Sequence, residues 1–450
     1  MERNRRFHVE VLSSSQNEKI IMRKILQLKL KWLAKLILKK YQPVVIGITG
    51  SIGKTSTKEA IYTVLKNHLA VRMSQKNYNN EIGLPLTIIG TESAGHNPFG
   101  WLKIFIQAGL LLLSKNPNYP KVLVLEMGVD RPGDLAYLTK LAPPQVGIVT
   151  AVSYSHLEYF GSLNNIKKEK QVLIDNLDNK GLAILNYDNG ATREMVEGSK
   201  ARVLTYGLQT GANLQAQDII YNFTKGNYEL SGLNFKLNYN GSVVPVFMKN
   251  VMAETALYAA LAAAAVGIYF EMNLVEIAAA LQDFILPRGR MNVLPGIKHT
   301  FIIDDTYNSS PEAVLAGLGV LRRIKIDEGA KKYAVLGDML EIGAYTEEGH
   351  RLIGENVVKS DLNYLVIVGE KSRDIVRGAL EAGFDSDNVF HFDRSEEAGK
   401  FLQDRIKAGD IIFIKGSQGV RMEKAVKEIM AEPERAKELL VRQGTEWPDA

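Results

Sequence analysis

Short apolar runs alternate with helix-like stretches along most of the chain, a pattern typical of a parallel sheet covered by helices. After the apolar run that begins at Val44, three further runs are expected to form buried strands: Val122 to Met127, Val146 to Val152 and Leu182 to Asn186. Each of these runs ends in polar residues. The carboxyl ends of parallel strands share one edge of a sheet, where open α/β sheets bind ligands. We therefore expect a ligand site at this edge.

The pattern changes between residues 203 and 247, where short alternating segments are separated by Asn/Gly turns, as in TKGNYELSGLNFKLNYNGSVVPVF. This spacing predicts a small antiparallel sheet. An Ala-rich helix is expected from Ala253 to Ile268. The Pro and Gly residues of the following LPRGRMNVLPG segment indicate a domain boundary near Pro287.

Beyond this boundary the alternation of strands and helices begins again. The expected strands are Phe301 to Asp305, Tyr333 to Leu336, Leu365 to Val368 and Ile411 to Ile414. The prediction is an α/β fold: a P-loop central ATPase domain with a parallel sheet plus a small antiparallel sheet, followed by a Rossmann-like C-terminal domain. The predicted divisions are a basic segment over 1–43, the central domain over 44–286 and the C-terminal domain over 287–450.

Residues 19–40 form a basic segment without any acidic residue. Ile21, Ile25, Leu28, Trp32, Leu36 and Lys39 follow helical spacing, which predicts a basic amphipathic helix. Two interpretations stay open: the helix lies on an anionic membrane, or it packs its apolar side on the nucleotide domain. A second apolar run, Phe99 to Leu113, is short for a bilayer span and contains Lys103, so it is interfacial or part of a core.

The composition is that of a soluble protein without cysteine chemistry. The 450 residues are 46% hydrophobic, which suffices for two or three soluble domains. Because the chain has no cysteine, disulfides and thiolate metal sites are excluded. No signal peptide is evident, and nothing indicates a nucleic-acid partner. The expected location is cytoplasmic, with peripheral contact at the inner face of the membrane through residues 19–40.

The segment VVIGITGSIGKTST, residues 44–57, predicts a phosphate-binding loop between a strand and a helix. Gly50 and Gly53 let the backbone approach a phosphate, Lys54 supplies a positive charge, and the Thr55 hydroxyl is a ligand for Mg²⁺. The common motif has Gly where this chain has Ile48, so the loop is a variant. The candidate ATP-binding residues of this loop are Gly50, Ser51, Ile52, Gly53, Lys54 and Thr55.

Three residues further along the chain are candidates for metal chemistry. Glu126 ends an expected strand, His156 follows the next strand, and Lys170 lies on the helix-like stretch after it. Magnesium prefers oxygen ligands, so Thr55 and Glu126 are the expected pair beside the terminal phosphate of ATP. A strand-end glutamate and a lone histidine also occur as purely structural residues.

Nine blocks in order, from TGSIGKTST through KNYNNEIGLPLTI, LEMGVDRPGDL, SHLEYFGS, ILNYDN, GRM, IDDTYNSSPEA and VLGDMLEIG to KGSQGVRMEK, resemble the Mur ligases. The resemblance covers residues 44 to about 430. It implies ATP-driven amide formation through an acyl-phosphate. Within the family, the chain is most similar to the ligases that add D-alanyl-D-alanine to a peptidoglycan precursor peptide.

The resemblance also implies roles for particular residues. The expected catalytic residues are Lys54, His156 and Lys170. Two Mg²⁺ ions are expected, one held by Thr55 and Glu126 and the other by His156. Lys170 matches a lysine that is carbamylated in the family and then serves as a metal ligand. On the nucleotide side the resemblance implies Asn186, Arg290, Asp305 and Asn308, and around the acceptor carboxylate it implies Asn77, Asn79 and Asn80.

One departure from the family pattern keeps alternatives open. Family members carry an amino-terminal domain that holds a UDP sugar, whereas only 43 residues precede the phosphate-loop strand here. The expectation is that this domain is missing. The uridine end of the acceptor is then unrecognised, bound by a partner protein, or replaced by a different anchor such as a lipid-linked or membrane-proximal acceptor. The alternatives are a Mur-type ligase for another carboxylate and amino acid, such as a polyglutamate or archaeal cell-wall ligase, and a non-ligating nucleotide-binding protein at the membrane.

Overall fold

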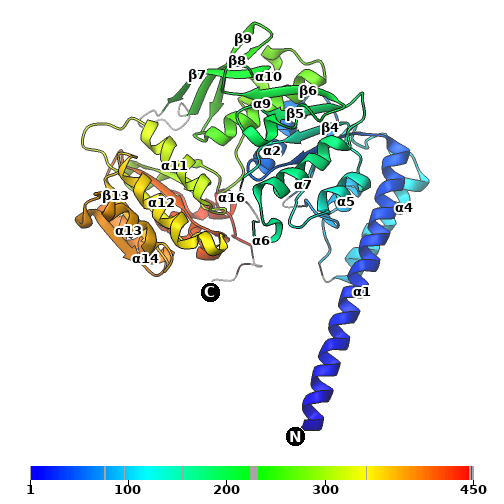
Figure 1. Ribbon diagram of the computed structural model, residues 1–450, viewed down its shortest axis with the longest axis horizontal. Helices are drawn as coiled ribbons and strands as arrows, with labels where there is room; N and C mark the ends of the chain where they lie inside the picture. Colours follow the sequence, from blue (N-terminus) through cyan, green and yellow to red (C-terminus); the bar gives the residue numbers. More distant parts are fainter. Residues whose placement is uncertain are drawn as a thin grey trace.

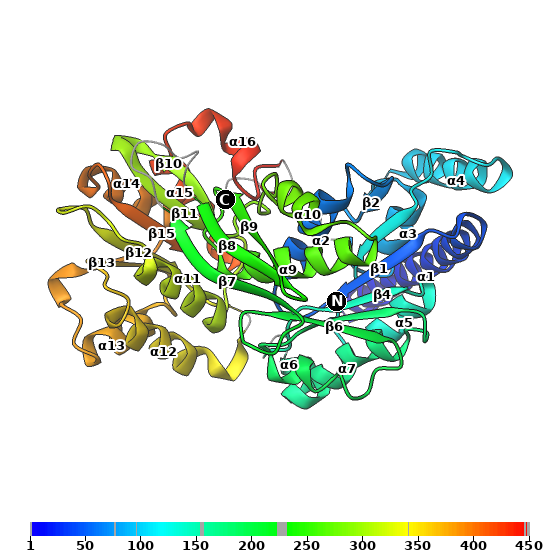
Figure 2. The ribbon, with the colours of Figure 1, turned by 90° about the horizontal axis from the view of Figure 1, so that it is seen from above.

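The chain forms two mixed sheets, each covered by helices on both faces, as Figures 1 and 2 show. The computed structural model describes residues 2–75, 78–95, 97–153, 157–222, 232–340, 342–444 and 447, and the side chains of all these except 2–21, 157 and 158. His156 and Asn77 therefore lie outside the described residues. The predicted α/β fold is confirmed.

The first sheet has nine strands in the order β2-β3-β1-β4-β5-β6-β7-β8-β9. Its strands from β2 to β7 are parallel to their neighbours, and β7, β8 and β9 pair antiparallel. The strands are β1 (Val44–Thr49), β2 (Val71–Met73), β3 (Val122–Glu126), β4 (Val146–Val149), β5 (Leu182–Asn186), β6 (Arg202–Gly207), β7 (Leu214–Asn222), β8 (Gly232–Tyr239) and β9 (Ser242–Lys249).

The predicted antiparallel segment is confirmed, and the structure shows how it is attached. Strand β6 pairs in parallel with β7, through Tyr206 opposite Leu214 and Gly207 opposite Gln215. The antiparallel strands therefore continue the parallel sheet instead of standing apart from it. The first strand of the predicted antiparallel segment, β6, belongs to the parallel part.

Alternate residues of the central strands enter two different cores. Ile46 and Ile48 of β1 face the core of α2 (Lys54–Leu65), α9 (Glu254–Tyr269) and α10 (Leu274–Leu281), while Val45 faces the opposite core. This is the two-residue period of a strand covered on both sides. The opposite face is covered by α1 (Glu2–Tyr41), α3 (Gly83–Ile89), α4 (Pro98–Leu113), α5 (Asp134–Leu141) and α7 (Leu163–Asp175). Two short helices, α6 (Leu157–Phe160) and α8 (Gly190–Arg193), lie in connections.

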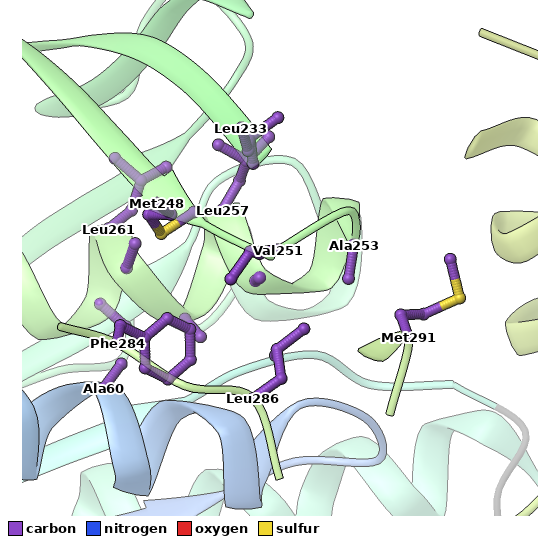
Figure 3. Packing of buried hydrophobic residues seen from close by; sticks show 14 of the residues in the cluster. Ala60, Leu233, Met248, Val251, Ala253, Leu257, Leu261, Phe284, Leu286 and Met291 are labelled. Atoms are coloured by element: carbon purple, nitrogen blue, oxygen red, sulfur yellow. The ribbon is translucent and has the colours of Figure 1, made fainter. Parts of the chain in front are cut away.

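The Ala-rich helix α9 is almost wholly buried and packs directly on α2. In the close view of Figure 3, Leu257 and Leu261 of α9 lie near Met248 of β9, and Phe284 lies beside the α2 residue Ala60. The small side chains of α9 allow its backbone to approach α2 closely. Helices α2 and α9 thus lie side by side on one face of the first sheet.

The second sheet has six strands in the order β10-β11-β15-β12-β13-β14, antiparallel only between β10 and β11. The strands are β10 (Asn292–Gly296), β11 (Thr300–Asp305), β12 (Lys332–Gly337), β13 (Tyr364–Val368), β14 (Val389–Phe392) and β15 (Ile411–Lys415). The helices that cover its two faces are α11 (Pro311–Arg323), α12 (Thr346–Val358) and α13 (Arg373–Glu381) on one side, and α14 (Ser395–Arg405), α15 (Glu423–Ile429) and α16 (Ala436–Leu439) on the other.

Helix α1 packs on the first sheet with a face that the spacing analysis did not single out. Leu30, Ala34 and Ile37 are fully buried against Val45 and its neighbours, whereas Leu28 and Trp32 of the predicted stripe are exposed. The amino-terminal part of α1 extends away from the body of the protein (Figure 1). Within the described residues, no helix has the length and apolarity needed to cross a bilayer.

Candidate active site

The phosphate loop, residues 50–55, connects β1 to α2 as predicted. Gly53 adopts the left-handed conformation at the N-cap of α2, with φ 87°, and no side chain caps this helix. The first amide groups of an uncapped helix point toward the space in front of it and favour an anion there. The loop thus has the backbone geometry of a phosphate site.

Gly50 has φ 149°, and a Cβ atom at this position would lie 1.9 Å from Thr150 Oγ1. Only glycine fits in such a space. The Thr150 hydroxyl in turn donates a 2.5 Å hydrogen bond to the Ile52 carbonyl, and Ser51 N donates to the Ala151 carbonyl at 2.8 Å. The two residues that follow β4 therefore hold the phosphate loop in place through hydrogen bonds.

Asn186 extends this support from the next strand. Its side-chain amide donates to the Thr150 carbonyl at 2.9 Å, and its Oδ1 accepts from Asp188 N at 3.0 Å. Asn186 is buried at the carboxyl end of β5. In this structure its side chain connects the ends of β4 and β5 and thereby positions the residue that braces the loop.

The Lys54 side chain folds onto the phosphate loop, where its ammonium group donates a 2.7 Å hydrogen bond to the Gly50 carbonyl. Burial lowers the pKa of Lys54; Arg290 lowers it further, and the carboxylates of Glu126 and Asp130 oppose the shift. Three charged groups therefore lie near enough to act on Lys54, although Arg290 comes from the connection between the two sheets.

Thr55 and Glu126 meet beside the loop. The Thr55 hydroxyl donates a 3.1 Å hydrogen bond to Glu126 Oε2, and Glu126 is only 3% exposed. Ser74 Oγ accepts a 3.1 Å hydrogen bond from the Glu126 backbone N–H, which fixes the end of β3. One hydroxyl and one carboxylate are the kind of protein donors that Mg²⁺ uses when a nucleotide supplies further oxygens.

Lys170 is buried on α7, with 3% of its surface exposed. Burial lowers its pKa to about 7, and the nearby Lys54 ammonium adds to this effect, while Glu169 and Asp130 oppose it. A lysine with this pKa is partly neutral near pH 7, and a neutral amine is nucleophilic. The structure thus brings Lys170 into the electrostatic neighbourhood of Lys54.

The Asn-rich turn is held by backbone contacts. Asn80 Oδ1 accepts hydrogen bonds from Ile82 N and Gly83 N, at 3.2 and 2.9 Å, and so supports the start of α3. The Asn79 carbonyl accepts from Gly128 N at 2.8 Å. Both residues line a cleft, so the turn is a structural element of that cleft.

This cleft has a volume of about 1940 Å³ and lies between the two sheets. Asn79, Gly128 and Asp130 contribute its wall on the first sheet, and Pro311 and Tyr345 contribute the opposite wall. Arg23 and Gln27 of α1 also border it, and Gln27 donates a 2.7 Å hydrogen bond to Glu81 at its rim. The cleft is large enough for a peptide-sized substrate.

In the connection between the two sheets, Arg290 stacks its guanidinium 4.3 Å from the centre of the Tyr307 ring. Tyr307 N donates to the Gly289 carbonyl at 2.9 Å, which ties the loop after β11 to the connection that carries Arg290. The guanidinium is thus held in place near enough to Lys54 to lower its pKa.

Asp305 and Asn308 lie in the same loop but differ in their contacts. Asp305 forms a 2.6 Å ion pair with Lys415, whose ammonium also donates to the Asn308 carbonyl at 2.8 Å. Asn308 Oδ1 is buried and has no hydrogen-bond partner in the described part of the chain. The Asp305 carboxylate is therefore already paired within the protein, whereas the Asn308 amide oxygen can accept a hydrogen bond from another donor.

Sequence reasoning missed three residues of this region. Asp130 lies in the cleft and acts on the pKa of both Lys54 and Lys170, Thr150 braces the loop, and Lys415 holds Asp305. Asp130 and Lys415 fall inside two of the quoted sequence blocks, but a strand end alone does not reveal which distant residue it meets.

The residues present fit a nucleotide with Mg²⁺. The uncapped start of α2 favours a phosphate, and Thr55 and Glu126 offer two oxygen donors. Where the structure describes side chains, no group of three His, Cys, Asp or Glu residues is placed to hold a metal by itself. A cation here thus depends on oxygens from the nucleotide, as is usual for Mg²⁺.

Two family models match the chain: the Mur ligase middle domain over residues 48–99 and 106–267, and the glutamate ligase domain of Mur ligases over residues 289–418. The UDP-N-acetylmuramoyl-tripeptide--D-alanyl-D-alanine ligase of Bacillus subtilis (strain 168) is 29% identical over 90% of this chain and 79% of its own length. The enzyme of the same name from Mycobacterium leprae (strain TN) is 30% identical, over 84% of this chain and 71% of its own length.

Among solved structures, the MurF ligase from Thermotoga maritima in complex with ADP superposes with a TM-score of 0.74 and 28% identity. The match covers 91% of this chain and 84% of that one. The resemblance inferred from the nine blocks is thus confirmed over nearly the whole length, in sequence and in fold. Mur ligases are ATP-dependent enzymes that form carbon–nitrogen bonds, and this chain belongs to the Mur ligase family.

Proposed function

We propose that this ligase joins D-alanyl-D-alanine to the peptide of a peptidoglycan precursor, through an acyl-phosphate of the peptide's terminal carboxylate. The names of the relatives from Bacillus subtilis and Mycobacterium leprae support these substrates. The observation that carries the chemistry is the meeting of Thr55 with Glu126 beside the phosphate loop. The proposal assigns phosphate binding to residues 44–286 and closure over the nucleotide to residues 287–450.

The chain's own residues divide the work at the phosphates. When bound, ATP supplies the phosphoryl group that activates the carboxylate, and Mg²⁺ neutralises negative charge. Lys54 exchanges its contact with the Gly50 carbonyl for a phosphate oxygen, and the amides at the start of α2 bind the same group. Thr55 and Glu126 hold the first cation. His156, which follows β4 in the sequence, is proposed for the second.

Lys170 is proposed to carry a carbamate. Its neutral amine adds to CO₂, forming one nitrogen–carbon bond and releasing one proton, and leaves a negatively charged carboxylate. The lowered pKa supports this step, because only the unprotonated amine reacts. The product places an anion beside Lys54 and supplies oxygen ligands suited to Mg²⁺.

Arg290 and Asn308 are proposed to act from the opposite wall. Arg290 is held by stacking on Tyr307 and lies near enough to lower the pKa of Lys54, so it is suited to a phosphate oxygen. The buried Asn308 oxygen, which lacks a partner in the described region, is suited to a nucleotide donor. Asn79 and Asn80, with Asn77 before them, are proposed to shape the acceptor side of the cleft.

The location and partners complete the proposal. The enzyme acts in the cytoplasm, and residues 19–40 make a peripheral contact with the inner face of the membrane. Its substrate partners are the peptidoglycan precursor peptide and D-alanyl-D-alanine.

The test is phosphate release from ATP and Mg²⁺ by the purified full chain. We expect release only when D-alanyl-D-alanine and a muramoyl-tripeptide are both present, with the pentapeptide product visible by mass spectrometry. UDP-linked, carrier-free and lipid-linked acceptors are compared in parallel. Release with another amino acid in place of D-alanyl-D-alanine would assign the chain to a different ligase, and release without any acceptor would contradict ligation altogether.

A further inference from the structure

Two helices at one end of the protein expose large apolar side chains. In α4, Phe99 and Leu113 are 80% and 87% exposed, while Ile104, Ala108 and Leu111 of the same helix are buried. Helix α4 therefore has one apolar face in the core and a second apolar face in solvent. We name the exposed residues of both helices the apolar face: Met22, Ile25, Leu28 and Trp32 of α1, with Phe99, Leu102, Ile106, Leu110 and Leu113 of α4.

The two helices are fastened together. The Lys40 ammonium near the end of α1 donates to the carbonyls of Leu111, Leu112 and Ser114 at the end of α4, at 2.9, 2.8 and 2.7 Å. The Tyr41 hydroxyl donates to the Leu111 carbonyl at 3.0 Å. Figures 1 and 2 both place α1 and α4 at the end of the molecule farthest from the second sheet. The apolar face is thus carried by one joined pair of helices, away from the wall formed by the second sheet.

The charged side chains of the two helices have a single sign, although Arg23 forms a 3.3 Å ion pair with Glu81 outside them. Residues 22–41 of α1 contain Arg23 and six lysines and no acidic residue, and α4 contains Lys103 and no acidic residue. Lys24, Lys29, Lys35 and Lys39 are exposed beside the apolar side chains of α1. Protein interfaces are depleted of lysine, whereas lysines that surround apolar and Trp side chains are typical of helices lying in an anionic lipid interface.

We propose that the apolar face is a docking surface for an anionic lipid bilayer. It extends the membrane contact proposed for residues 19–40 to α4, which supplies the more continuous apolar stripe. Phe99, Leu102 and Ile106 enter the boundary of the acyl chains, and the exposed lysines bind the lipid phosphates. Because no described helix can span a bilayer, the contact is peripheral and reversible.

The proposal is tested by cosedimentation of the full chain with vesicles, without ATP or substrates, so its outcome does not depend on the ligase reaction. One set of vesicles holds equal parts of phosphatidylcholine and phosphatidylglycerol, and the other holds phosphatidylcholine alone. We expect binding to the anionic vesicles to be at least about tenfold tighter, since each basic residue near the surface contributes. Raised salt should weaken it.

The decisive variant combines Leu102→Gln, Ile106→Gln and Leu110→Gln. We expect at least about a tenfold loss of binding, because three apolar side chains no longer enter the lipid. The matched control combines Ile220→Gln, Val243→Gln and Val275→Gln, exposed apolar residues on other parts of the surface, and should bind like the wild type. Circular dichroism confirms that both variants are folded.

A charge variant combines Lys24→Gln, Lys29→Gln, Lys35→Gln and Lys39→Gln, and should bind anionic vesicles no better than neutral ones. Wild-type protein that fails to sediment with anionic vesicles would overturn the proposal. So would an α4 variant that sediments like the wild type. A dimer in sedimentation velocity that the α4 variant dissociates, without vesicle binding by the wild type, would assign the apolar face to a second copy of the chain.

Discussion

The Thr55 hydroxyl and the Glu126 carboxylate, 71 residues apart in sequence, are joined by a 3.1 Å hydrogen bond beside the phosphate loop. Parallel pairing of β1 with β3 brings them together, because the pairing sets Ile48 opposite Glu126. The sheet therefore determines where these two oxygen donors meet.

Glu126→Gln should raise the Mg²⁺ concentration needed for half-maximal phosphate release by at least about tenfold, since the amide keeps a hydrogen bond to Thr55 but loses the charge. The measurement is a Mg²⁺ titration of the phosphate-release assay. Glu197→Gln, an exposed carboxylate on another part of the surface, serves as the control. An unchanged Mg²⁺ requirement in Glu126→Gln would remove Glu126 from the proposed metal site.

Lys54→Ala should lower kcat for phosphate release by at least about a hundredfold, because a fixed positive charge at the transferred phosphate is lost. Lys66→Ala, at the exposed far end of α2, should have no effect on the rate. The two variants are compared in the same assay and by thermal unfolding. If the Lys54 variant is folded and fully active, the phosphate loop has been assigned wrongly.

Gly50→Ala should weaken ATP binding by about tenfold or more and destabilise the protein by about 1–3 kcal/mol, because the added methyl group meets Thr150 Oγ1 in a strained backbone conformation. Gly109→Ala in α4, where nothing lies within 4 Å of the added atom, should be neutral or stabilising. Isothermal titration with ATP and a urea titration separate the two effects. Equal ATP affinity in both variants would contradict the close contact at Gly50.

The lowered pKa of Lys170 predicts a pH dependence of stability. The unfolded chain holds the Lys170 proton up to pH 10.5 and the folded chain only up to about 7, so stability should rise as the pH increases across this interval. The size is on the order of 1.4 kcal/mol per pKa unit. Urea titrations in CO₂-free buffer should show Lys170→Met to be the more stable protein at pH 7, with the difference closing toward pH 10.5.

The carbamate has its own measurement. ¹³C NMR with labelled bicarbonate should show a carbamate signal in the wild type that is missing in Lys170→Met. A signal of equal size in both proteins would place the modification on another amine. Lys170→Ala should be inactive and regain part of its activity with added formate or acetate.

Lys415→Met should destabilise the protein by about 3–5 kcal/mol, because the Asp305 carboxylate is left buried without its ion-pair partner. Combining Lys415→Met with Asp305→Leu removes both charges and should recover most of this loss. The midpoints of chemical unfolding give the comparison. A double variant no better than Lys415→Met alone would show that the pair contributes through packing and not through charge.

The sequence was a reliable guide where local pattern decides the structure. The phosphate loop, the strands that end near Glu126 and Asn186, and the Ala-rich helix all lie close to their predicted positions. Strand β14 was not predicted, since its four residues are only partly buried at the edge of the sheet and lack a continuous apolar signal.

Features that depend on distant contacts were harder to predict. Both sides of α1 are apolar, so spacing alone did not reveal that Leu30 faces the core and Trp32 the solvent. In the same way, the sequence around Asp305 does not reveal its ion pair with Lys415, and the sequence around Asp130 does not reveal its effect on the pKa of Lys170. His156 and Asn77 lie outside the described residues, and their roles stay predictions.

The close packing of α9 on α2 links a structural helix to catalysis. A Cβ atom at Gly267 would lie 2.9 Å from Ile277 Cδ1 and 3.3 Å from Val64 Cγ1, so this position leaves no room for a larger side chain. Volume added there presses on Ile277 of α10 first and then on Val64 of α2, the helix whose first two residues are Lys54 and Thr55. Selection for ATP use should therefore act on α9 as well, and this helix should accept larger side chains less readily in evolution than a helix that does not contact α2.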